Sequence, residues 1–237
     1  MSNMITVGSY KSRKGRMIPS RQRALDELWF DYGIAEQGPL DLDLLFGRRA
    51  PCHLEIGFGM GDTLLEMARR HPENNFLGVD VYLPGIGQLL LGCFELGLTN
   101  VRIARGDAVE LLDRLETGSL ERVILFFPDP WPKKRHHKRR LVQPPFVDKL
   151  RRTIAPGGYF HAATDWEGYA LQISRIMAAA EGFANLSASG SFYEGAVERP
   201  LTKFEKRGLK KGHQVRDLLF ERTKIQPFRP DQRASRT

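Results

Sequence analysis

The sequence predicts an α/β fold with one doubly wound, mostly parallel seven-stranded sheet of Rossmann-like type and an antiparallel strand pair at its C-terminal end. Short apolar runs alternate with segments of helical periodicity from residue 52 to residue 180. Helices that connect successive strands place those strands parallel in one sheet. Beyond residue 180, two further strand-like runs follow without a helix between them, which favours an added antiparallel pair.

Each element is predicted from its own pattern. Apolar runs indicate the parallel strands, at residues 52–56, 75–81, 101–104, 122–127 and 159–163. Apolar residues that recur every three or four positions indicate helices at residues 21–32, 62–70, 83–96, 108–115, 145–154 and 168–180. Pro156-Gly157-Gly158 is expected to end the fifth helix. The last two strands are expected at residues 184–188 and 215–222, on either side of a polar stretch at residues 190–212.

The length of 237 residues suits a single α/β domain, which we expect at residues 21–225. A basic and flexible N-terminal arm is expected at residues 1–20, and a polar tail at residues 226–237. The net charge of +8 and the pI of about 9.7 favour a polyanionic partner. The arm is either simply solvated or lies on phosphates, and the sequence leaves both interpretations open.

Cysteine content and hydropathy indicate the cellular compartment of the protein. Cys52 and Cys93 are too few and too isolated for a disulfide framework, so both are expected in the core of a protein from a reducing environment. The sequence shows no apolar run long enough for a membrane span and no secretory signal. We therefore expect a cytoplasmic protein without a membrane partner.

A glycine loop after the first strand predicts a cofactor site. Gly57 and Gly59 follow Glu55, and two more acids, Asp80 and Asp107, come at or just after the ends of the next two strands. Glycines let a ligand approach the backbone, and an acid after the second strand suits a ribose. Several carboxylates favour a cationic nucleoside such as S-adenosylmethionine, and they would repel the diphosphate of a dinucleotide. The alternative is that the acids are ordinary loop residues at strand ends.

An acid between two prolines ends the fourth strand. Asp129 lies between Pro128 and Pro130, and an aromatic residue follows. At the carboxyl end of a parallel strand this acid is expected beside the cofactor. Its alternative role is a turn cap.

A dense basic run, residues 133–140, comes directly after this acid. Such a run is often a solvated face or a localisation signal, but its position here favours binding of an RNA backbone. No spacing of ligands supports a metal site at its two histidines. The residues expected to bind RNA are Arg135, His136, His137, Lys138, Arg139 and Arg140.

Five segments together resemble the bacterial tRNA (guanine-N7)-methyltransferase family. They occur in order over most of residues 15–222, and their joint occurrence is more specific than the glycine loop alone. The segments are Gly15-Arg16 with the helix that follows, residues 54–59, residues 127–131 with the basic run, residues 164–167 and residues 202–205.

The resemblance implies a class I methyltransferase fold, S-adenosylmethionine as donor, S-adenosylhomocysteine as product, no metal, and methylation of a guanine in the tRNA variable loop. It implies cofactor contacts by Glu55, Gly57, Gly59, Asp80, Asp107 and Asp129, with Asp129 at the catalytic position. It implies substrate contacts by Lys133, Asp165, Thr202, Lys203, Phe204 and Glu205. Two positions depart from the family pattern: Asp80 stands where a Glu is usual, and Pro132 where a His is frequent.

The chemistry of guanine N7 agrees with these residues. N7 is a bare acceptor, so its methylation requires no general base. Asp129 or Asp165 can stabilise the positive charge that develops on the purine. Glu205 or Asp165 can accept hydrogen bonds from guanine N1–H and the 2-amino group, which would exclude adenine.

Three other functions remain open at this point. A methyltransferase for a different substrate would share the glycine loop and the acids. A nucleic-acid-binding protein with an inactive methyltransferase fold would not need every cofactor acid, and a nicotinamide dehydrogenase would leave residues 129–140 unexplained. The sequence requires no protein partner and is compatible with a monomer or a homodimer.

Overall fold

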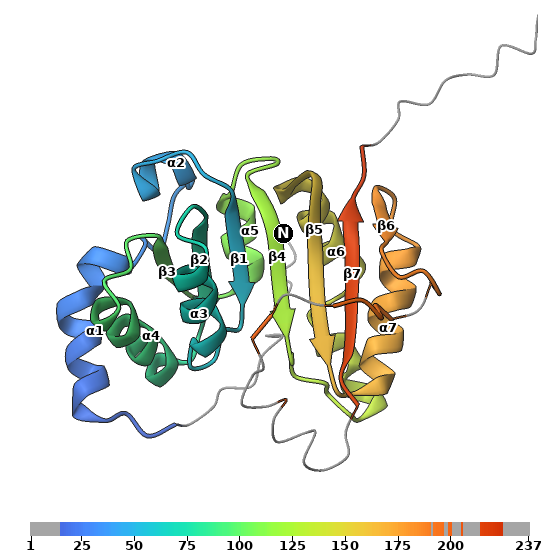
Figure 1. Ribbon diagram of the computed structural model, residues 1–237. Helices are drawn as coiled ribbons and strands as arrows, with labels where there is room; N and C mark the ends of the chain where they lie inside the picture. The colour runs from blue at the N-terminus through green and yellow to red at the C-terminus, as the bar shows by residue number, and fades with distance from the viewer. Residues whose placement is uncertain (1–14, 191, 197–198, 201–204, 206–213, 225–237) are drawn as a thin grey trace, which may run out of the picture.

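The computed structural model contains one seven-stranded sheet with the order β3-β2-β1-β4-β5-β7-β6 (Figure 1). The structure describes residues 15–190, 192–196, 199–200, 205 and 214–224. Strands β1 to β5 pair in parallel, and β7 is antiparallel to both β5 and β6, so the predicted fold class is confirmed. The strands are β1 (Cys52–Ile56), β2 (Asn75–Asp80), β3 (Val101–Arg105), β4 (Leu120–Phe126), β5 (Ile154–Thr164), β6 (Phe183–Asn185) and β7 (Arg216–Arg222).

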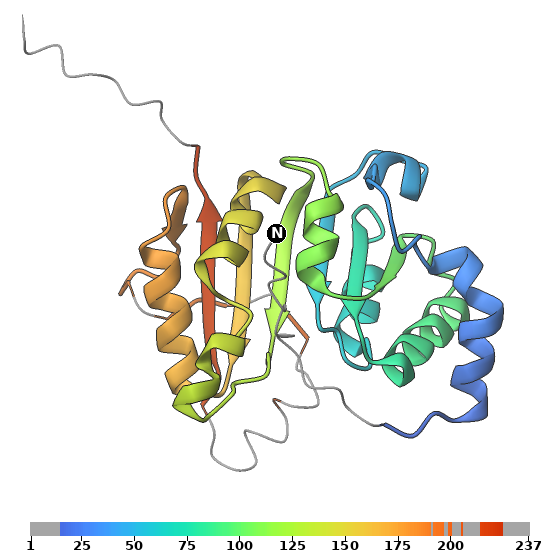
Figure 2. The ribbon, with the colours of Figure 1, turned by 180° about the vertical axis from the view of Figure 1, so that it is seen from behind.

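Helices cover both faces of the sheet. One group lies in front of the left half of the sheet in Figure 1 and comprises α1 (Pro19–Tyr32), α3 (Asp62–Arg70) and α4 (Leu83–Glu95). The other group lies in front in Figure 2 and comprises α5 (Ala108–Arg114), α6 (Pro144–Thr153) and α7 (Glu167–Ala178). Two short helices were not expected: α2 (Leu42–Phe46) and the 3₁₀ helix η1 (Lys134–Arg139). Both are too short to show helical periodicity in the sequence.

Because helices cover both faces of the sheet, its central strands are apolar on both sides. All five residues of β1 are buried, and Leu54, Leu77 and Val123 of the neighbouring strands β1, β2 and β4 have no exposed surface. Ile56 pairs with Val79 on one side and with Leu125 on the other. The carboxyl ends of β1, β2 and β4 are therefore level, and the loops after them share one edge.

Several boundaries differ from their predictions by a few residues, and the start of β5 differs most. Helix α6 ends at Thr153 and β5 begins at once with Ile154, so Pro156-Gly157-Gly158 lies inside a strand. The pairing register between β4 and β5 shifts across this segment. Proline and glycines are typical of such irregularities, and here they mark a bulge and not the end of the helix.

The two cysteines lie in the core as predicted. Burial raises the pKa of both the Cys52 and the Cys93 thiols to about 12, so neither is a thiolate near neutral pH. In the part of the chain that the structure describes, no helix is both long enough and apolar enough to cross a membrane. The tail at 226–237 and residues 1–14 of the arm lie outside the described residues, as does most of the stretch 190–212.

Candidate functional site

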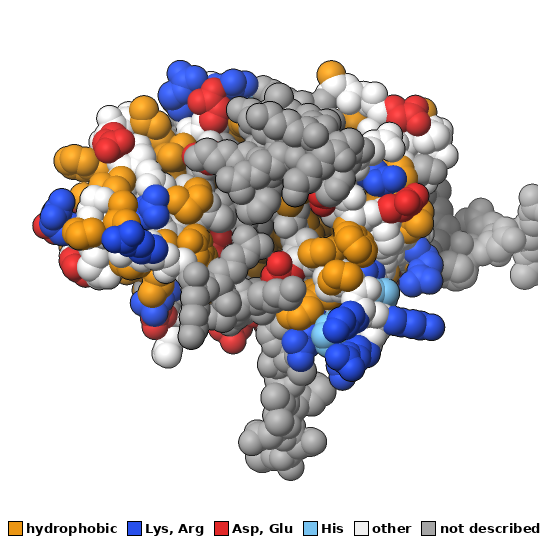
Figure 3. All heavy atoms as spheres, turned by 90° about the horizontal axis from the view of Figure 1, so that it is seen from below, with side chains coloured by type: hydrophobic (Ala, Val, Ile, Leu, Met, Phe, Trp, Pro, Cys, Tyr) orange, Lys and Arg blue, Asp and Glu red, His pale blue; other side chains and the backbone are white. Residues whose placement is uncertain are grey.

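The predicted acids meet at one edge of the sheet. Strand order reverses between β1 and β4, and open α/β sheets bind their ligands at such a reversal, outside the carboxyl ends of the strands. Figure 3 shows the molecule from this edge. The side chains that follow or end the five parallel strands are those of Asp80, Asp107, Asp129 and Asp165, together with Glu55 near the end of β1.

The loop after β1 faces open space. Gly57 and Gly59 have φ angles of 71° and 59°, a region that side chains rarely adopt, and a Cβ atom on either would meet nothing within 4 Å. The other side of the loop is packed closely, because a Cβ on Gly85 of α4 would come within 1.7 Å of the Gly59 carbonyl oxygen. The loop is thus a supported backbone turn with room for a ligand above it.

Asp80 holds this loop in place. Its Oδ2 accepts a hydrogen bond from the Gly59 amide at 2.8 Å, and its Oδ1 accepts from the amides of Val81 and Tyr82 at 2.7 and 2.9 Å. This structural role was not expected from the sequence. A carboxylate oxygen has two lone pairs, so Oδ2 retains one for a ribose hydroxyl.

Glu55 is a buried acid at the centre of the edge. Burial, followed by the nearby charge of Asp80, raises the pKa of its carboxyl to about 8. A cation beside Glu55 would favour its ionised form. The open glycine loop and the buried carboxyl therefore fit a ligand that carries positive charge, as the sulfonium and ammonium groups of S-adenosylmethionine do.

Asp107 has a structural role that is compatible with ligand binding. It is the N-cap of α5, and its Oδ1 accepts a hydrogen bond from the Val109 amide at 2.7 Å. The residue is half-buried, and its second oxygen is not needed for the cap. The structural interpretation of this acid is confirmed, and its contact with a cofactor stays a prediction.

Asp129 lies in a strained turn. Phe127 and Trp131, on either side of it, have φ angles of 50° and 44°, in the region that usually requires glycine. Such conformations cost about 1–3 kcal/mol each and persist where the surrounding structure enforces them. Here the Phe127 amide donates to the Ala163 carbonyl at 2.7 Å, and the Trp131 side chain is buried. The half-buried acid is thus held on a turn anchored at both ends.

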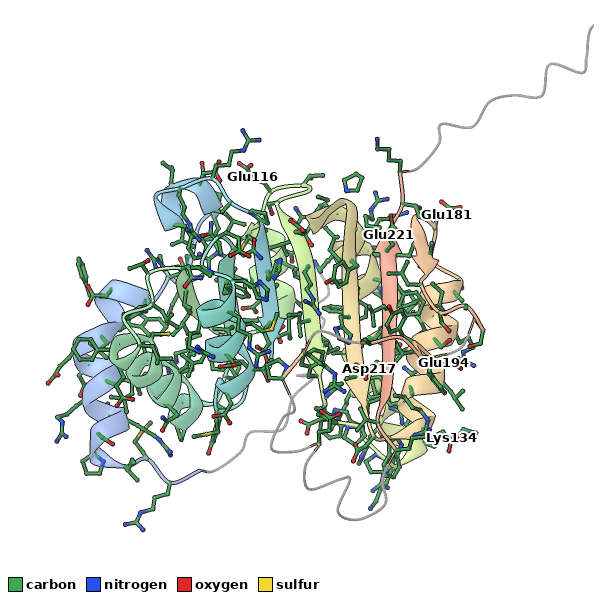
Figure 4. All side chains as sticks on the ribbon, viewed as in Figure 1. Glu116, Lys134, Glu181, Glu194, Asp217 and Glu221 are labelled. Carbon is green, nitrogen blue, oxygen red and sulfur yellow. The ribbon has the colours of Figure 1, made fainter. Side chains whose placement is uncertain are left out.

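The basic run presents four cations to solvent. Its exposed side chains are those of Lys133, Lys134, Arg135 and Lys138. Figure 3 shows Lys, Arg and His side chains gathered on the side that carries the carboxyl ends of the parallel strands, and Figure 4 places Lys134 at the same lower end of the molecule. Helix η1 therefore offers a compact cationic surface beside the strained turn.

Other residues of the run point inward. The His136 ring lies edge-on to Trp131 with centroids 5.9 Å apart, and the Arg139 guanidinium lies 5.0 Å from the centre of the same indole. His137 is half-buried. Arg140 is only 3% exposed and donates to carbonyl groups, so the predicted contact of Arg140 with RNA does not fit its place in the structure. Its side chain fills an internal position that a run of like charges does not reveal.

The remaining predicted substrate residues have different surroundings. Asp165 is exposed between β5 and α7, directly after Thr164, whose Oγ1 accepts a hydrogen bond from the Trp166 amide at 3.2 Å. Thr202, Lys203 and Phe204 lie outside the described residues. Glu205 is 6% exposed and pairs with Arg199.

A buried polar chain continues from this pair into the sheet. Arg199 donates from Nε and Nη2 to the two carboxylate oxygens of Asp217, both at 2.9 Å. Asp217 Oδ1 is 2.8 Å from His161 Nε2, and His161 Nδ1 is 3.0 Å from Arg122 Nη2. Arginine only donates, so Nδ1 accepts and Nε2 carries the proton. Burial lowers the pKa of His161 to about 4, in agreement with this neutral ring.

The sequence analysis did not predict this series of hydrogen-bonded side chains. Its members are far apart in the sequence, and each resembles an ordinary strand or loop residue. Figure 4 shows Asp217 on β7, beside β5. Among the described residues, no three His, Cys, Asp or Glu side chains are grouped to hold a metal ion.

Comparison with known sequences identifies relatives over most of the chain. The family model described as "Putative methyltransferase" matches residues 49–218. A tRNA (guanine-N(7)-)-methyltransferase of Nitrosococcus oceani is 52% identical over 219 residues, which are 92% of this chain and 91% of the relative. The enzymes of the same name from Aeromonas hydrophila and Hydrogenovibrio crunogenus are 52% and 50% identical, over 92% and 91% of this chain and 93% and 91% of their own lengths.

Solved structures share the fold at low sequence identity. The 16S rRNA methyltransferase KamB superimposes with a TM-score of 0.58 at 15% identity, over 81% of this chain and 98% of its own. The antibiotic-resistance methyltransferase Kmr gives a TM-score of 0.56 at 19% identity, over 78% and 93% of the two chains. These similarities concern the fold alone.

Proposed function

This chain belongs to the family of tRNA (guanine-N(7)-)-methyltransferases, and we propose that it transfers the methyl group of S-adenosylmethionine to N7 of a guanine in the tRNA variable loop. The product is 7-methylguanosine. One structural observation supports the proposal independently of the names of the relatives. A glycine loop with a buried acid, an acid on a strained turn and an exposed basic surface lie at the same edge of the sheet.

The loop after β1 and three acids would hold the cofactor, which supplies a methyl group on a positively charged sulfur. Glu55 would ionise beside this cation, and Gly57 and Gly59 leave the space it needs. Asp80 keeps the loop in shape and retains an acceptor for the ribose, and Asp107 retains one for an amine. Asp129 completes the set from the end of β4.

Asp129 also acts on the incoming base. Guanine N7 attacks with its own lone pair, and no proton is removed. Positive charge moves onto the purine, where a fixed carboxylate in a partly buried site stabilises it. The anchored turn holds Asp129 in place before the base arrives, so the carboxylate need not reorganise during the reaction.

The exposed cations of the basic run bind the RNA backbone. Lys133, Lys134, Arg135 and Lys138 are free of the internal contacts made by their neighbours Arg139 and Arg140. Lys133, Asp165 and residues 202–205 are proposed to contact the nucleotide that is methylated. This substrate also supports the proposal of a cytoplasmic enzyme.

Mass spectrometry of tRNA nucleosides tests the proposal. Incubation of an unmodified tRNA transcript with the protein and S-adenosylmethionine should produce 7-methylguanosine. A transcript with adenine in place of the variable-loop guanine should remain unmethylated. Labelling of both transcripts would show a different methyl acceptor, and binding of tRNA without any methyl transfer would support an inactive binding protein.

A further inference from the structure

We propose that Arg140 is a positioning residue that fixes the turn of Asp129 relative to the start of α7. The proposal rests on the proposed function, because that function gives Asp129 and Asp165 their roles. It departs from the expectation that every cation of residues 133–140 contacts RNA.

The contacts of Arg140 join two elements. Its Nε donates to the carbonyl oxygen of Pro130 at 2.8 Å, one residue after the proposed catalytic acid. Its Nη1 donates to the Gly168 carbonyl at 3.1 Å and to Gln172 Oε1 at 2.6 Å, both on α7. One planar guanidinium therefore ties the Asp129 turn to the helix that begins two residues after Asp165.

An aromatic ring completes the site around this guanidinium. The centre of Tyr169, on the same helix, lies 4.9 Å from the Arg140 guanidinium carbon, within the range of a cation–π contact. Tyr169 is fully buried, and its hydroxyl accepts a hydrogen bond from the Val142 amide at 3.2 Å. The ring is thus held rigidly, and it limits the orientations that Arg140 can adopt.

Burial separates Arg140 from the RNA-binding residues. It is 3% exposed, whereas Arg135 and Lys138 in the short helix that precedes it are exposed. Moving its guanidinium to a phosphate would leave the carbonyls of Pro130 and Gly168 without their donor. These hydrogen bonds come from a charged donor and are stronger than those between neutral groups, so a movement that breaks them is unfavourable.

Positioning matters because the Asp129 turn is strained. The left-handed conformations at Phe127 and Trp131 need external contacts to persist, and Arg140 supplies one between them. Without it the turn is free to relax, and the carboxylate moves relative to the methyl donor and the base. A displacement of about 1 Å can lower a rate about 100-fold.

The test compares Arg140→Gln with Lys138→Ala. For Arg140→Gln we expect kcat for tRNA methylation to fall about 10- to 100-fold, with tRNA affinity and its salt dependence unchanged. For Lys138→Ala we expect weaker tRNA binding, with the slope of log affinity against log salt concentration lower by about one, a loss that Arg140→Gln should not share. Hydrogen exchange should be faster in the peptide of residues 127–133 for Arg140→Gln only.

Two further variants control for folding. Arg102 also donates to three carbonyl groups and covers the ring of Phe46, so Arg102→Gln should lower stability without a change in kcat. Gln172→Met removes one acceptor of Arg140, leaves the basic run intact and should also lower kcat. This variant provides the test if Arg140→Gln does not fold.

The proposal is wrong if Arg140→Gln weakens tRNA binding as Lys138→Ala does, or if Arg140→Gln and Gln172→Met both keep the wild-type kcat and exchange rate. An inactive wild-type protein would refute the proposed function instead. The hydrogen-exchange comparison would still decide whether Arg140 holds the turn.

Discussion

Arg199 and Glu205 form a two-pronged ion pair in which both terminal nitrogens of the guanidinium face the two carboxylate oxygens, with Nη2 and Oε1 2.9 Å apart. Both side chains are only 7% exposed. The same guanidinium binds Asp217 of β7, so the acid of residues 202–205 is connected to the sheet. Guanine recognition by Glu205 would therefore start from a carboxylate that is already oriented.

Replacing Glu205 and Asp165, which are proposed to contact the base, tests guanine recognition. Glu205→Gln and Asp165→Asn should each lower kcat/KM for tRNA by about 10-fold or more, because a neutral amide accepts less strongly from guanine N1–H and the 2-amino group. Methylation assays on tRNA transcripts measure this. Glu194→Gln changes an exposed acid of the preceding segment and should have no effect. Full activity of both test variants would exclude these acids from base recognition.

Breaking the buried ion pair between Arg199 and Asp217 should destabilise the fold. Burial alone would raise the pKa of Asp217, but hydrogen bonds from His161 and Arg199 lower it to about 2. Asp217→Asn leaves Arg199 paired with Glu205 but without its second carboxylate, and should lower the free energy of unfolding by about 1–3 kcal/mol in denaturant titrations at pH 7. Asp113→Asn breaks an ion pair with Lys149 in which Asp113 is 54% exposed, and should cost below about 1 kcal/mol.

The Arg199–Asp217 ion pair should make the stability of the fold depend on pH in the acid range. A depressed carboxyl pKa contributes stability above the unfolded value of about 4 that is lost as the pH falls toward 2. The stability difference between wild type and Asp217→Asn should therefore shrink over this range. A difference that stayed constant from pH 7 to pH 2 would contradict the assigned charge state.

Removal of the acid on the strained turn should separate binding from chemistry. Asp129→Ala should bind S-adenosylmethionine with little loss, because the glycine loop and three other acids remain. Methyl transfer to tRNA should be largely lost, since the carboxylate proposed to stabilise the charge on the purine from the anchored turn is removed. Calorimetry and single-turnover methylation measure the two effects, and turnover near the wild-type rate would remove Asp129 from the mechanism.

Cofactor binding should release a proton. The pKa of Glu55 is about 8 in the free protein, and a neighbouring cation lowers it, so the complex holds fewer protons between the two pKa values. Affinity for S-adenosylmethionine should rise with pH up to about 8, by at most about tenfold per unit. Calorimetry in buffers of different ionisation enthalpy measures the proton release at pH 7. Glu55→Gln should abolish it, and an unchanged release in this variant would assign the proton to another group.

Salt dependence should identify the cations that contact RNA. Each phosphate contact contributes about 0.7–0.9 to the slope of log affinity against log salt concentration. Arg135→Ala should lower the slope for tRNA by about this amount in filter-binding titrations. Arg69→Ala removes an exposed cation at the far end of α3 and should leave the slope unchanged. Equal slopes for wild type and Arg135→Ala would show that Arg135 does not contact phosphate.

Periodic segments of the sequence were sufficient to predict most elements. The ranges 52–56 and 62–70 agree with β1 and α3 at both ends, because an apolar strand and an amphipathic helix have their own local signals. Helices α2 and η1 were not predicted, because helices this short have no recognisable periodic signal in the sequence. The segment 156–158 was misinterpreted because proline and glycines suit both a helix end and a bulge.

By itself the sequence determined the order of strands and helices, the glycine loop and the acids at the strand ends. These features depend on spacing along the chain and on the chemistry of single residues. Only the tertiary structure decided which cations of residues 133–140 face solvent, because burial depends on contacts with α7 that no local pattern contains. It likewise decided that Arg199 binds both Glu205 and Asp217, since Asp217 reaches this position only when β7 lies against β5.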